Sequence, residues 1–313
     1  MYGTIQTKGT KRKMKKNNTD ITFAFFGTPE LAVTILDELK TVGLVPAVIV
    51  TRPDKPKGRG GHSSPPPTKE WAIENDVDAL QPEKIKGEFL EEIKNTEWDV
   101  FVVAAYGKIL PKELLDIPKK GTLNVHPSLL PKLRGPSPIR SAILTDEKEM
   151  GVSVMLLDEE MDHGPIIAQA RVELEEWPPR AALLEGVLAK EGGQLLAEVL
   201  PLWINDEIDS KEQDHSKATT CSFLKKEDAE INLADDPYQN LLKIRGYEGW
   251  PGAFTFFERN LPGQTGGKRI RVVITDAHID TSGALVIDKV IPEGKKEMLS
   301  ADFERSGATS ISR

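Results

Sequence analysis

An asparagine and a histidine stand two positions apart in the short apolar stretch TLNVH, at residues 122–126. Alternate side chains of a β-strand point to the same face, so Asn124 and His126 could both address one small molecule. Taken alone, the two residues are explained about equally well by a turn cap and a hydrogen-bonded surface histidine. The segment that follows, PSLLPKLRGPSP, favours a site, because its prolines fix the backbone and Gly135 permits close approach to a ligand.

Asp162 belongs to a second segment, MDHGP, which is typical of a turn between two apolar runs. On its own, this aspartate is most simply a turn residue at a favoured position. Together with Asn124 and His126 it completes a set of a carboxylate, an imidazole and an amide. A carboxylate can orient a histidine and stabilise its cationic form, and an amide can donate a hydrogen bond to an oxygen that gains negative charge. The three residue types therefore suit attack on a carbonyl group.

Two basic segments could bind phosphate groups. The first spans residues 51–72 and contains Arg52, Lys55, Lys57 and Arg59. The second is GGKRIRVV, with Lys268, Arg269 and Arg271. Each is explained at least as well by a surface that is merely solvated, a flexible loop in the first case and one strand face in the second. The functional alternative is a surface that contacts phosphates.

Other motifs give weaker signals or none. FFGTPELA has a single glycine where a dinucleotide fingerprint needs three, and no P-loop sequence occurs. The five histidines are scattered and the chain has one cysteine, so the sequence spells out no zinc site. Tyr106 follows an apolar run, in AAYGKILP, and could line a site, although packing in the core explains it equally well.

The order of the predicted elements indicates an α/β protein. Apolar runs predict strands at residues 21–27, 45–51, 99–107, 122–126 and 151–157. Helical patterns lie between several of them, and repeated strand–helix–strand order favours a parallel sheet covered by helices. Ligands of such sheets bind outside the carboxyl ends of the strands, and His126 lies at one of these ends.

The second part of the chain has a different pattern. Apolar residues at helical spacing predict a long helix from residue 179 to about 205, and the polar run after it predicts a linker. A short helix at residues 237–246 and several β-like segments then predict a small β-rich domain, which we expect to be a barrel. We thus divide the chain into a disordered basic leader at 1–19, an α/β domain at 20–205, a linker at 206–220 and a barrel at 221–305.

Composition limits the possible functions. The 313 residues carry a net charge of −8, which disfavours a non-specific coat on nucleic acid but allows a local basic patch. The chain has no run of 18 apolar residues, and its basic N-terminus lacks the apolar core of a secretory signal. A single cysteine, Cys221, fits a reducing compartment. We expect a cytoplasmic monomer.

Five stretches occur in an order that resembles the methionyl-tRNA formyltransferase family, whose members use 10-formyltetrahydrofolate. They are FFGTPELAV, TRPDKPKGRG, AAYGKILPKELLDIPKKGTLNVHPSLLPKLRGPSPI, GVSVMLLDEEMDHGPIIAQ and RGYEGWPGAFTFF, and the resemblance runs from about residue 21 to 289. NVHPSLLP and MDHGP are shared by the wider group of formyltransferases and specify the chemistry. The acceptor is indicated by TRPDKPKGRG and by the second domain with GWPGAF.

The resemblance implies a Rossmann-like formyltransferase domain, a C-terminal barrel of the oligonucleotide-binding type, and roles for particular residues. Asn124, His126 and Asp162 would be the catalytic set. The folate pocket would be shaped by Ser128, Leu129, Leu130, Pro131, Tyr106 and Gly107. Initiator methionyl-tRNA would be held by Arg52, Lys55, Lys57, Arg59, Lys268, Arg269 and Arg271, and no metal is implied. Pro127, PSP after Gly135 and the tail beyond residue 291 depart from the family pattern, but none of these removes a catalytic side chain.

The expected reaction is transfer of a formyl group from the folate to the α-amine of methionyl-tRNA, as a step of translation initiation. Three alternatives remain open at this point. The acceptor could be another amine, such as that of a sugar nucleotide. The protein could instead hydrolyse 10-formyltetrahydrofolate, or it could bind tRNA without catalysis.

Overall fold

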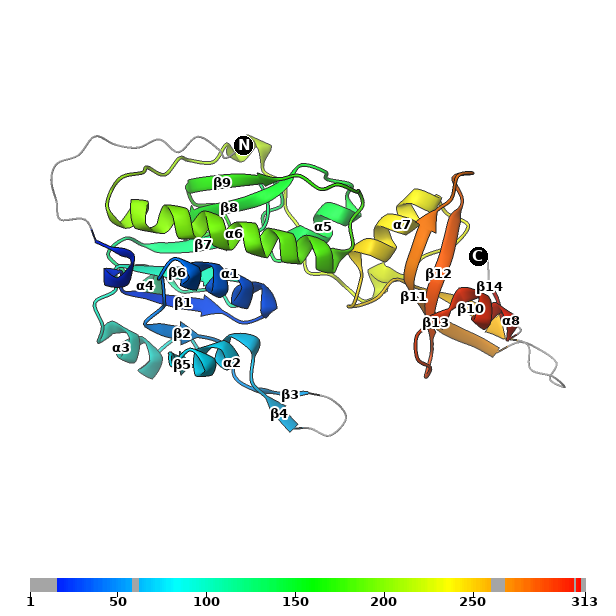
Figure 1. Cartoon of the computed structure of the whole chain (residues 1–313), viewed down its shortest axis with the longest axis horizontal. Coiled ribbons are helices and arrows are strands. Elements are labelled where there is room, and N and C mark those ends of the chain that lie inside the picture. The colour runs from blue at the N-terminus through cyan, green and yellow to red at the C-terminus, as the bar shows by residue number, and fades with distance from the viewer. Residues whose placement is uncertain (1–15, 58–61, 260–267, 307, 311–313) are drawn as a thin grey trace. The chain divides into compact units, whose positions relative to one another are not determined.

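The computed structural model describes residues 16–57, 62–259, 268–306 and 308–310 (Figure 1). The chain divides into two compact units. The first unit comprises Met1–Pro136, Glu149–Glu173 and Glu185–Cys221, and the second comprises Ser137–Lys148, Leu174–Leu184 and Ser222–Arg313. Two segments that the sequence places inside the first domain therefore cluster with the C-terminal residues. Residues 1–15 of the expected leader lie outside the described residues.

A seven-stranded sheet forms the centre of the first unit. Its strand order is β5-β2-β1-β6-β7-β8-β9. The bounds are β1 Phe23–Gly27, β2 Val48–Val50, β5 Asp78–Leu80, β6 Val100–Ala104, β7 Thr122–His126, β8 Met150–Leu156 and β9 Ile166–Val172. Neighbours from β5 to β7 pair in parallel, which confirms the predicted parallel sheet, whereas β8 and β9 extend it by antiparallel pairing.

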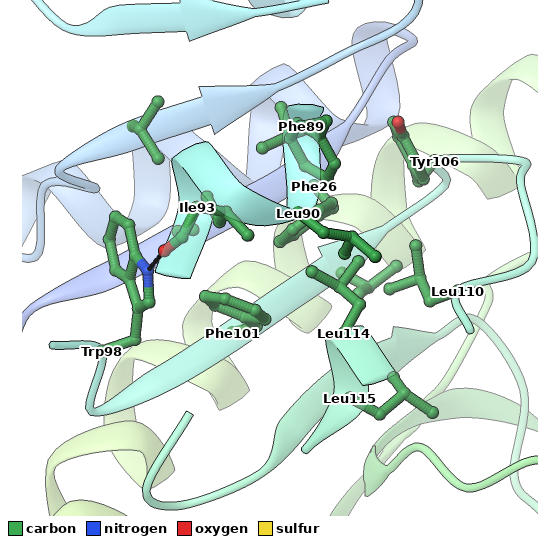
Figure 2. Close-up of a cluster of buried hydrophobic side chains, with 14 residues drawn as sticks. Phe26, Phe89, Leu90, Ile93, Trp98, Phe101, Tyr106, Leu110, Leu114 and Leu115 are labelled. Carbon is green, nitrogen blue, oxygen red and sulfur yellow. Dashed lines mark hydrogen bonds between the residues drawn. The ribbon is translucent and has the colours of Figure 1, made fainter. Parts of the chain in front are cut away.

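One face of this sheet is covered by the short helices α3 (Glu88–Lys94) and α4 (Lys112–Leu115). Figure 2 shows the resulting core, in which Phe26 and Phe101 of the sheet meet Phe89 and Leu114 of the helices. The cluster also contains Tyr106, only 1% of whose surface is exposed. β1 and β6 are buried along their whole lengths, as continuous apolar runs require in a sheet covered on both faces.

The opposite face is covered by α1 (Glu30–Thr41) and by the long helix α6 (Ala181–Ile204). Two adjacent glycines let α6 approach closely: a Cβ atom on Gly193 would lie 2.7 Å from Cβ of Glu38 in α1, and one on Gly192 would lie 2.7 Å from Cγ1 of Val125 in β7. The side chain of Val125 thus points to the α6 face. Its neighbours in β7, Asn124 and His126, therefore point to the other face.

The first unit also contains α2 (Pro67–Glu74), the 3₁₀ turns η1 (Asn18–Asp20) and η2 (His215–Lys217), and a small hairpin. The hairpin pairs β3 (Lys55–Lys57) with β4 (His62–Ser64) and carries part of the basic segment predicted from the sequence. Arg59 lies outside the described residues.

The second unit contains a five-stranded antiparallel sheet in the order β13-β12-β11-β10-β14. Its strands are β10 Phe254–Arg259, β11 Lys268–Ile279, β12 Leu285–Pro292, β13 Met298–Leu299 and β14 Ala308–Ser310. The helical elements are α5 Pro138–Leu144, η3 Glu227–Ala229, α7 Pro237–Gly246 and α8 Ser300–Arg305. The structure confirms the helix predicted at 237–246, which packs Leu241 and Ile244 against Phe254 and Val272 of the sheet. No helix in the described part of the chain is long and apolar enough to cross a membrane.

Candidate active site

Asn124 and His126 lie in the last half of β7, on the sheet face that α6 does not cover. His126 is 4% exposed, and Asn124 is half-buried. The residues paired with them in β8 are Ser153 opposite His126 and Met155 opposite Asn124. The two polar side chains expected from the spacing TLNVH thus share one face, as alternation along a strand requires.

Asp162 reaches the same place from the turn between β8 and β9. Its backbone has a φ angle of +50°, a left-handed conformation that aspartate tolerates better than most residues. One carboxylate oxygen, Oδ2, accepts a hydrogen bond of 2.7 Å from the backbone N–H of Gly135. The other, Oδ1, lies 3.5 Å from Nδ2 of Asn124 and 3.7 Å from Nδ1 of His126. The amide, imidazole and carboxylate predicted from the sequence are therefore neighbours.

The hydrogen bonds of His126 define which ring nitrogen can exchange a proton. Nε2 lies 3.0 Å from the backbone carbonyl of Leu133, and a carbonyl can only accept, so Nε2 carries a hydrogen. In the neutral ring Nδ1 is then free of hydrogen, and it faces Asp162. A proton taken up at Nδ1 would produce a cation next to a carboxylate, which stabilises it. This arrangement suits a group that accepts a proton and passes it on.

The loop after β7 is held in shape by polar side chains from β8 and β9. The hydroxyl of Ser153 donates to the carbonyl of Ser128 (2.7 Å) and accepts from the N–H of Leu130 (3.1 Å). Gln169, the partner of Ser153 in β9, donates to Ser153 Oγ (2.8 Å) and to the carbonyl of Leu130 (2.9 Å). The Ser128 hydroxyl itself donates to the carbonyl of Lys132. The loop at residues 128–131 is thus held by hydrogen bonds that occupy the Ser128 hydroxyl and the backbone carbonyls of Ser128 and Leu130.

Four residues of this site were not identified from the sequence: Arg134, Ser153, Gln169 and Gln213. Ser153 in β8 pairs with His126, and Gln169 in β9 pairs with Ser153, so the three side chains share one face of the sheet. The register of these strands, had it been known, would have identified both residues. Gln213 lies in the segment expected to be a linker, yet it is 5% exposed and hydrogen-bonds to the carbonyls of Asp162 and Gly164. A polar segment gives no local sign of such burial.

The chain is similar to known formyltransferases in sequence and in fold. The profile of the formyl transferase family matches residues 20–200. A methionyl-tRNA formyltransferase of Myxococcus xanthus is 38% identical over 299 residues, 89% of this chain and 93% of its own. Another, of Chloroflexus aggregans, is 44% identical over 236 residues, 74% of this chain and 75% of its own.

This chain belongs to the formyl transferase family. The resemblance stated from the sequence is thereby confirmed. Among solved structures, a methionyl-tRNA formyltransferase of Clostridium thermocellum has a TM-score of 0.55 at 16% identity, covering 87% of this chain and 98% of its own. An N-formyltransferase of Helicobacter canadensis, solved with folinic acid and dTDP-3-aminofucose, has a TM-score of 0.57 at 17% identity, covering 81% and 95%. At these identities the two structures show that the fold is that of formyltransferases.

Two residues predicted to line the folate pocket of this formyl transferase follow β6. The ring of Tyr106 lies in the core of Figure 2, and its hydroxyl has no hydrogen-bond partner among the described residues. Burial raises the pKa of this hydroxyl to about 12. The carbonyls of Tyr106 and Gly107 both accept from the guanidinium of Arg52, at 3.1 Å in the case of Tyr106. Arg52 is thus bound to the backbone beside the predicted pocket.

The other basic residues predicted to bind the acceptor occupy both units. Lys55 in β3 is exposed, and Lys57 ends the same strand. In the second unit the guanidinium of Arg269 lies 3.7 Å from the ring centre of Phe256, and that of Arg271 lies 3.9 Å from the ring centre of Phe254. Lys268 begins the same strand, β11. One face of the β10–β11 pair therefore carries alternating aromatic rings and guanidinium groups.

No three histidine, cysteine, aspartate or glutamate side chains within the described ranges are grouped so that they could hold a metal ion. The polar groups of the site in this formyl transferase are instead directed at one another and at the backbone.

Proposed function

We propose that this protein transfers the formyl group of 10-formyltetrahydrofolate to the α-amine of initiator methionyl-tRNA, for translation initiation in the cytoplasm. The observation that carries the proposal is that Asn124 Nδ2 and His126 Nδ1 both lie within 3.7 Å of Oδ1 of Asp162. The acceptor is supported by the Myxococcus xanthus methionyl-tRNA formyltransferase, whose similarity covers 89% of this chain and therefore both units.

The reaction requires little activation of the nucleophile. An α-amine has a pKa of about 7.7–8.0, so a useful fraction is neutral at physiological pH. The neutral amine attacks the formyl carbon, a C–N bond forms, and the carbonyl oxygen becomes an oxyanion. The amide N–H of Asn124 donates to that oxygen. Holding the two substrates in reach of each other can contribute roughly 7–11 kcal/mol in favourable cases.

His126 acts on the protons of the tetrahedral intermediate. Its Nδ1 accepts the proton that the attacking nitrogen releases, while Asp162 stabilises the resulting imidazolium. The same proton then passes to the folate nitrogen as the bond between that nitrogen and the formyl carbon breaks. Formylated methionyl-tRNA and tetrahydrofolate leave, and His126 is neutral again.

The folate co-substrate is proposed to lie along the rigid loop at Ser128, Leu129, Leu130 and Pro131, next to Tyr106 and Gly107. Support comes from the hydrogen bonds that Ser153 and Gln169 make to this loop, which hold it in one shape beside Asn124 and His126. The Helicobacter canadensis relative in fold was solved with folinic acid, a formylated folate.

The tRNA is proposed to contact Arg52, Lys55, Lys57 and Arg59 in the first unit and Lys268, Arg269 and Arg271 in the second. Guanidinium groups that stack on the partly buried ring of Phe256 and the buried ring of Phe254 are held in place on this face, and their positive charge suits contact with the phosphates of nucleic acid. We further infer that the antiparallel sheet of the second unit closes as a barrel of the oligonucleotide-binding type. The length of β11, which pairs with both β10 and β12 and has register shifts near Asp276, supports strong curvature there.

The deciding experiment incubates the full chain with 10-formyltetrahydrofolate labelled in its formyl group and with charged initiator tRNA. Label on the amino acid after deacylation of the tRNA is expected. Formylation of a sugar-nucleotide amine in preference to methionyl-tRNA would overturn the acceptor. Formate released at full rate without an acceptor would indicate a hydrolase, and tRNA binding without turnover would indicate a non-catalytic protein.

A further inference from the structure

Gln213 is the single buried residue in an otherwise exposed stretch of chain. All other residues from 211 to 217 are exposed, whereas Gln213 is 5% exposed. Burying an amide is unfavourable unless its hydrogen-bonding groups find partners. The partners of Gln213 therefore explain why this stretch lies where it does.

Every hydrogen-bonding position of the Gln213 amide is used. Nε2 donates to the carbonyl of Asp162 at 2.9 Å and to that of Gly164 at 2.7 Å. Oε1 accepts from Nε and Nη2 of Arg134, at 3.1 and 2.7 Å. Because a guanidinium can only donate, Arg134 fixes which end of the amide is the oxygen. The N–H groups must then face the two carbonyls.

These two carbonyls belong to the turn that carries the Asp162 carboxylate. Asp162 has the positive φ angle, and the residue next to Arg134, Gly135, donates its N–H to Oδ2 of the same aspartate. The backbone of the turn is thus held through Gln213, and the carboxylate is held through Gly135. Gln213 is in turn hydrogen-bonded to Arg134, so both the backbone and the carboxylate of the turn are held by the adjacent residues Arg134 and Gly135.

A further contact holds the other side of the turn. Nη2 of Arg134 also donates to Nδ1 of His215 at 2.8 Å, and the ring of His215 stacks on that of His163, with centres 4.2 Å apart and planes at 4°. Gln213 and His215 therefore contact the turn at Asp162, His163 and Gly164. The exposed stretch acts as a clamp on three consecutive residues.

We propose that Gln213 and Arg134 are positioning residues for catalysis, which hold Asp162 where it can stabilise the imidazolium of His126. The inference rests on the proposed function for its kinetic readout. Neither side chain touches the reacting groups, so each acts through the position of Asp162. The specific prediction is that kcat depends on the N–H donors of the Gln213 side chain and not on the volume of that side chain.

The test compares Gln213→Glu with Gln213→Met and with Asp214→Asn. Glutamate keeps the shape and the pairing with Arg134 but has no N–H to donate, and methionine keeps the volume. Both should lower kcat roughly 10- to 100-fold, since a displacement of about 1 Å can cost on the order of 10²-fold. KM for the charged tRNA should change little. Asp214→Asn alters the adjacent exposed residue and should leave kcat unchanged.

A double-mutant cycle tests whether the two residues act as a unit. Arg134→Met should lower kcat about as much as Gln213→Met, and the double variant should be within roughly threefold of either single variant, because residues that share one action are not additive. The proposal would be overturned if the losses of kcat in the two single variants multiplied in the double variant. A Gln213→Glu variant with normal kcat would overturn it as well.

A readout independent of formyl transfer separates this inference from the proposed function. Crystal structures of Gln213→Glu and of the parent chain should differ in the position of the Asp162 carboxylate relative to His126. The rest of the fold should be the same in both structures. An unmoved Asp162 would contradict the clamp even if the parent chain transfers formyl groups. A moved Asp162 in a chain that does not act on methionyl-tRNA would instead overturn only the proposed acceptor.

Discussion

The polar site of the first unit and the basic aromatic face of the second use their side chains in opposite ways. Around Asp162, the carboxylate, the His126 ring and the Gln213 amide hydrogen-bond to the backbone, and His126 and Asp162 are almost fully buried. On the β10–β11 face, the guanidinium groups of Arg269 and Arg271 stack on aromatic rings, and Arg269 is exposed.

The difference predicts different tolerance to substitution. A buried network depends on the identity of each donor and acceptor, because a group left unpaired costs its full desolvation. Binding of nucleic acid by a charged surface depends mainly on the charge and the area of that surface, and each single contact contributes little to the affinity. Substitutions in the first region should therefore abolish turnover, whereas those in the second should weaken tRNA binding by small steps.

The largest effect is expected for the three central side chains. Asn124→Ala should lower kcat about 10²- to 10³-fold, equivalent to roughly 2.7–4 kcal/mol of transition-state stabilisation, because it removes a donor to the oxyanion. His126→Ala and Asp162→Ala should fall in a similar range. Single-turnover formyl transfer measures the effect, and filter binding should show that tRNA affinity is retained. Near-normal transfer by all three variants would contradict the assignment of the site.

A smaller loss is expected for Gly135→Ala. Gly135 has a φ angle of +119°, and a Cβ atom there would lie 2.2 Å from the carbonyl oxygen of Cys221. The strain should lower the free energy of unfolding by about 1–3 kcal/mol and should displace the N–H that binds Asp162, which lowers kcat as well. Urea unfolding and steady-state kinetics measure the two effects. Loss of stability with normal kcat would show that this N–H does not position Asp162.

The basic face should respond by still smaller steps. Arg269→Ala should raise the Kd for tRNA about two- to fivefold, which corresponds to roughly 0.5–1 kcal/mol for the loss of one exposed charge pair with a phosphate. It should also reduce the steepness with which binding falls with salt, while Arg269→Lys should keep that steepness because the charge remains. Titrations at several salt concentrations compare the two variants. A loss of kcat at saturating tRNA would break the contrast between the two regions.

The smallest effect is expected for Tyr106→Phe. Removing a buried hydroxyl without a described partner should leave the free energy of unfolding unchanged or raise it by up to about 1 kcal/mol. In the folded chain the pKa of Tyr106 is raised to about 12 by burial, whereas an unfolded tyrosine ionises near pH 10. Between these values the unfolded state loses its proton first, so stability falls as pH rises from 10 to 12.

Tyr106→Phe should remove that part of the alkaline loss, which equilibrium unfolding at pH 9 and 11 would show. An increase of several-fold in KM for the folate, with unchanged stability, would instead place the hydroxyl in contact with the co-substrate.

Local patterns were sufficient to predict the parallel strands and the common face of Asn124 and His126, because strand alternation depends only on neighbouring residues. The association of Asp162 with them came from residue chemistry and from the resemblance to formyltransferases. The antiparallel direction of β8 and β9 could not be predicted, since alternation is the same in both directions.

Long-range contacts account for what the sequence did not reveal. Gln213 lies in a polar segment with the composition of a linker. Its burial depends on hydrogen bonds to carbonyls about fifty residues earlier in the chain. Likewise, nothing near Arg52 in the sequence indicates that it binds the carbonyls of Tyr106 and Gly107. The predicted roles of the basic loop, with Arg59 outside the described residues, stay predictions.

The close approach of Gly192 to Val125 links α6 to the candidate site on the other face of the sheet. Val125 lies between Asn124 and His126 in β7. A steric contact that displaces Val125 would therefore also displace the backbone that carries both polar side chains. An alanine at position 192 would push that strand from behind with a single methyl group. We therefore expect Gly192→Ala to lower formyl transfer through packing alone, although it removes no side-chain hydrogen bond.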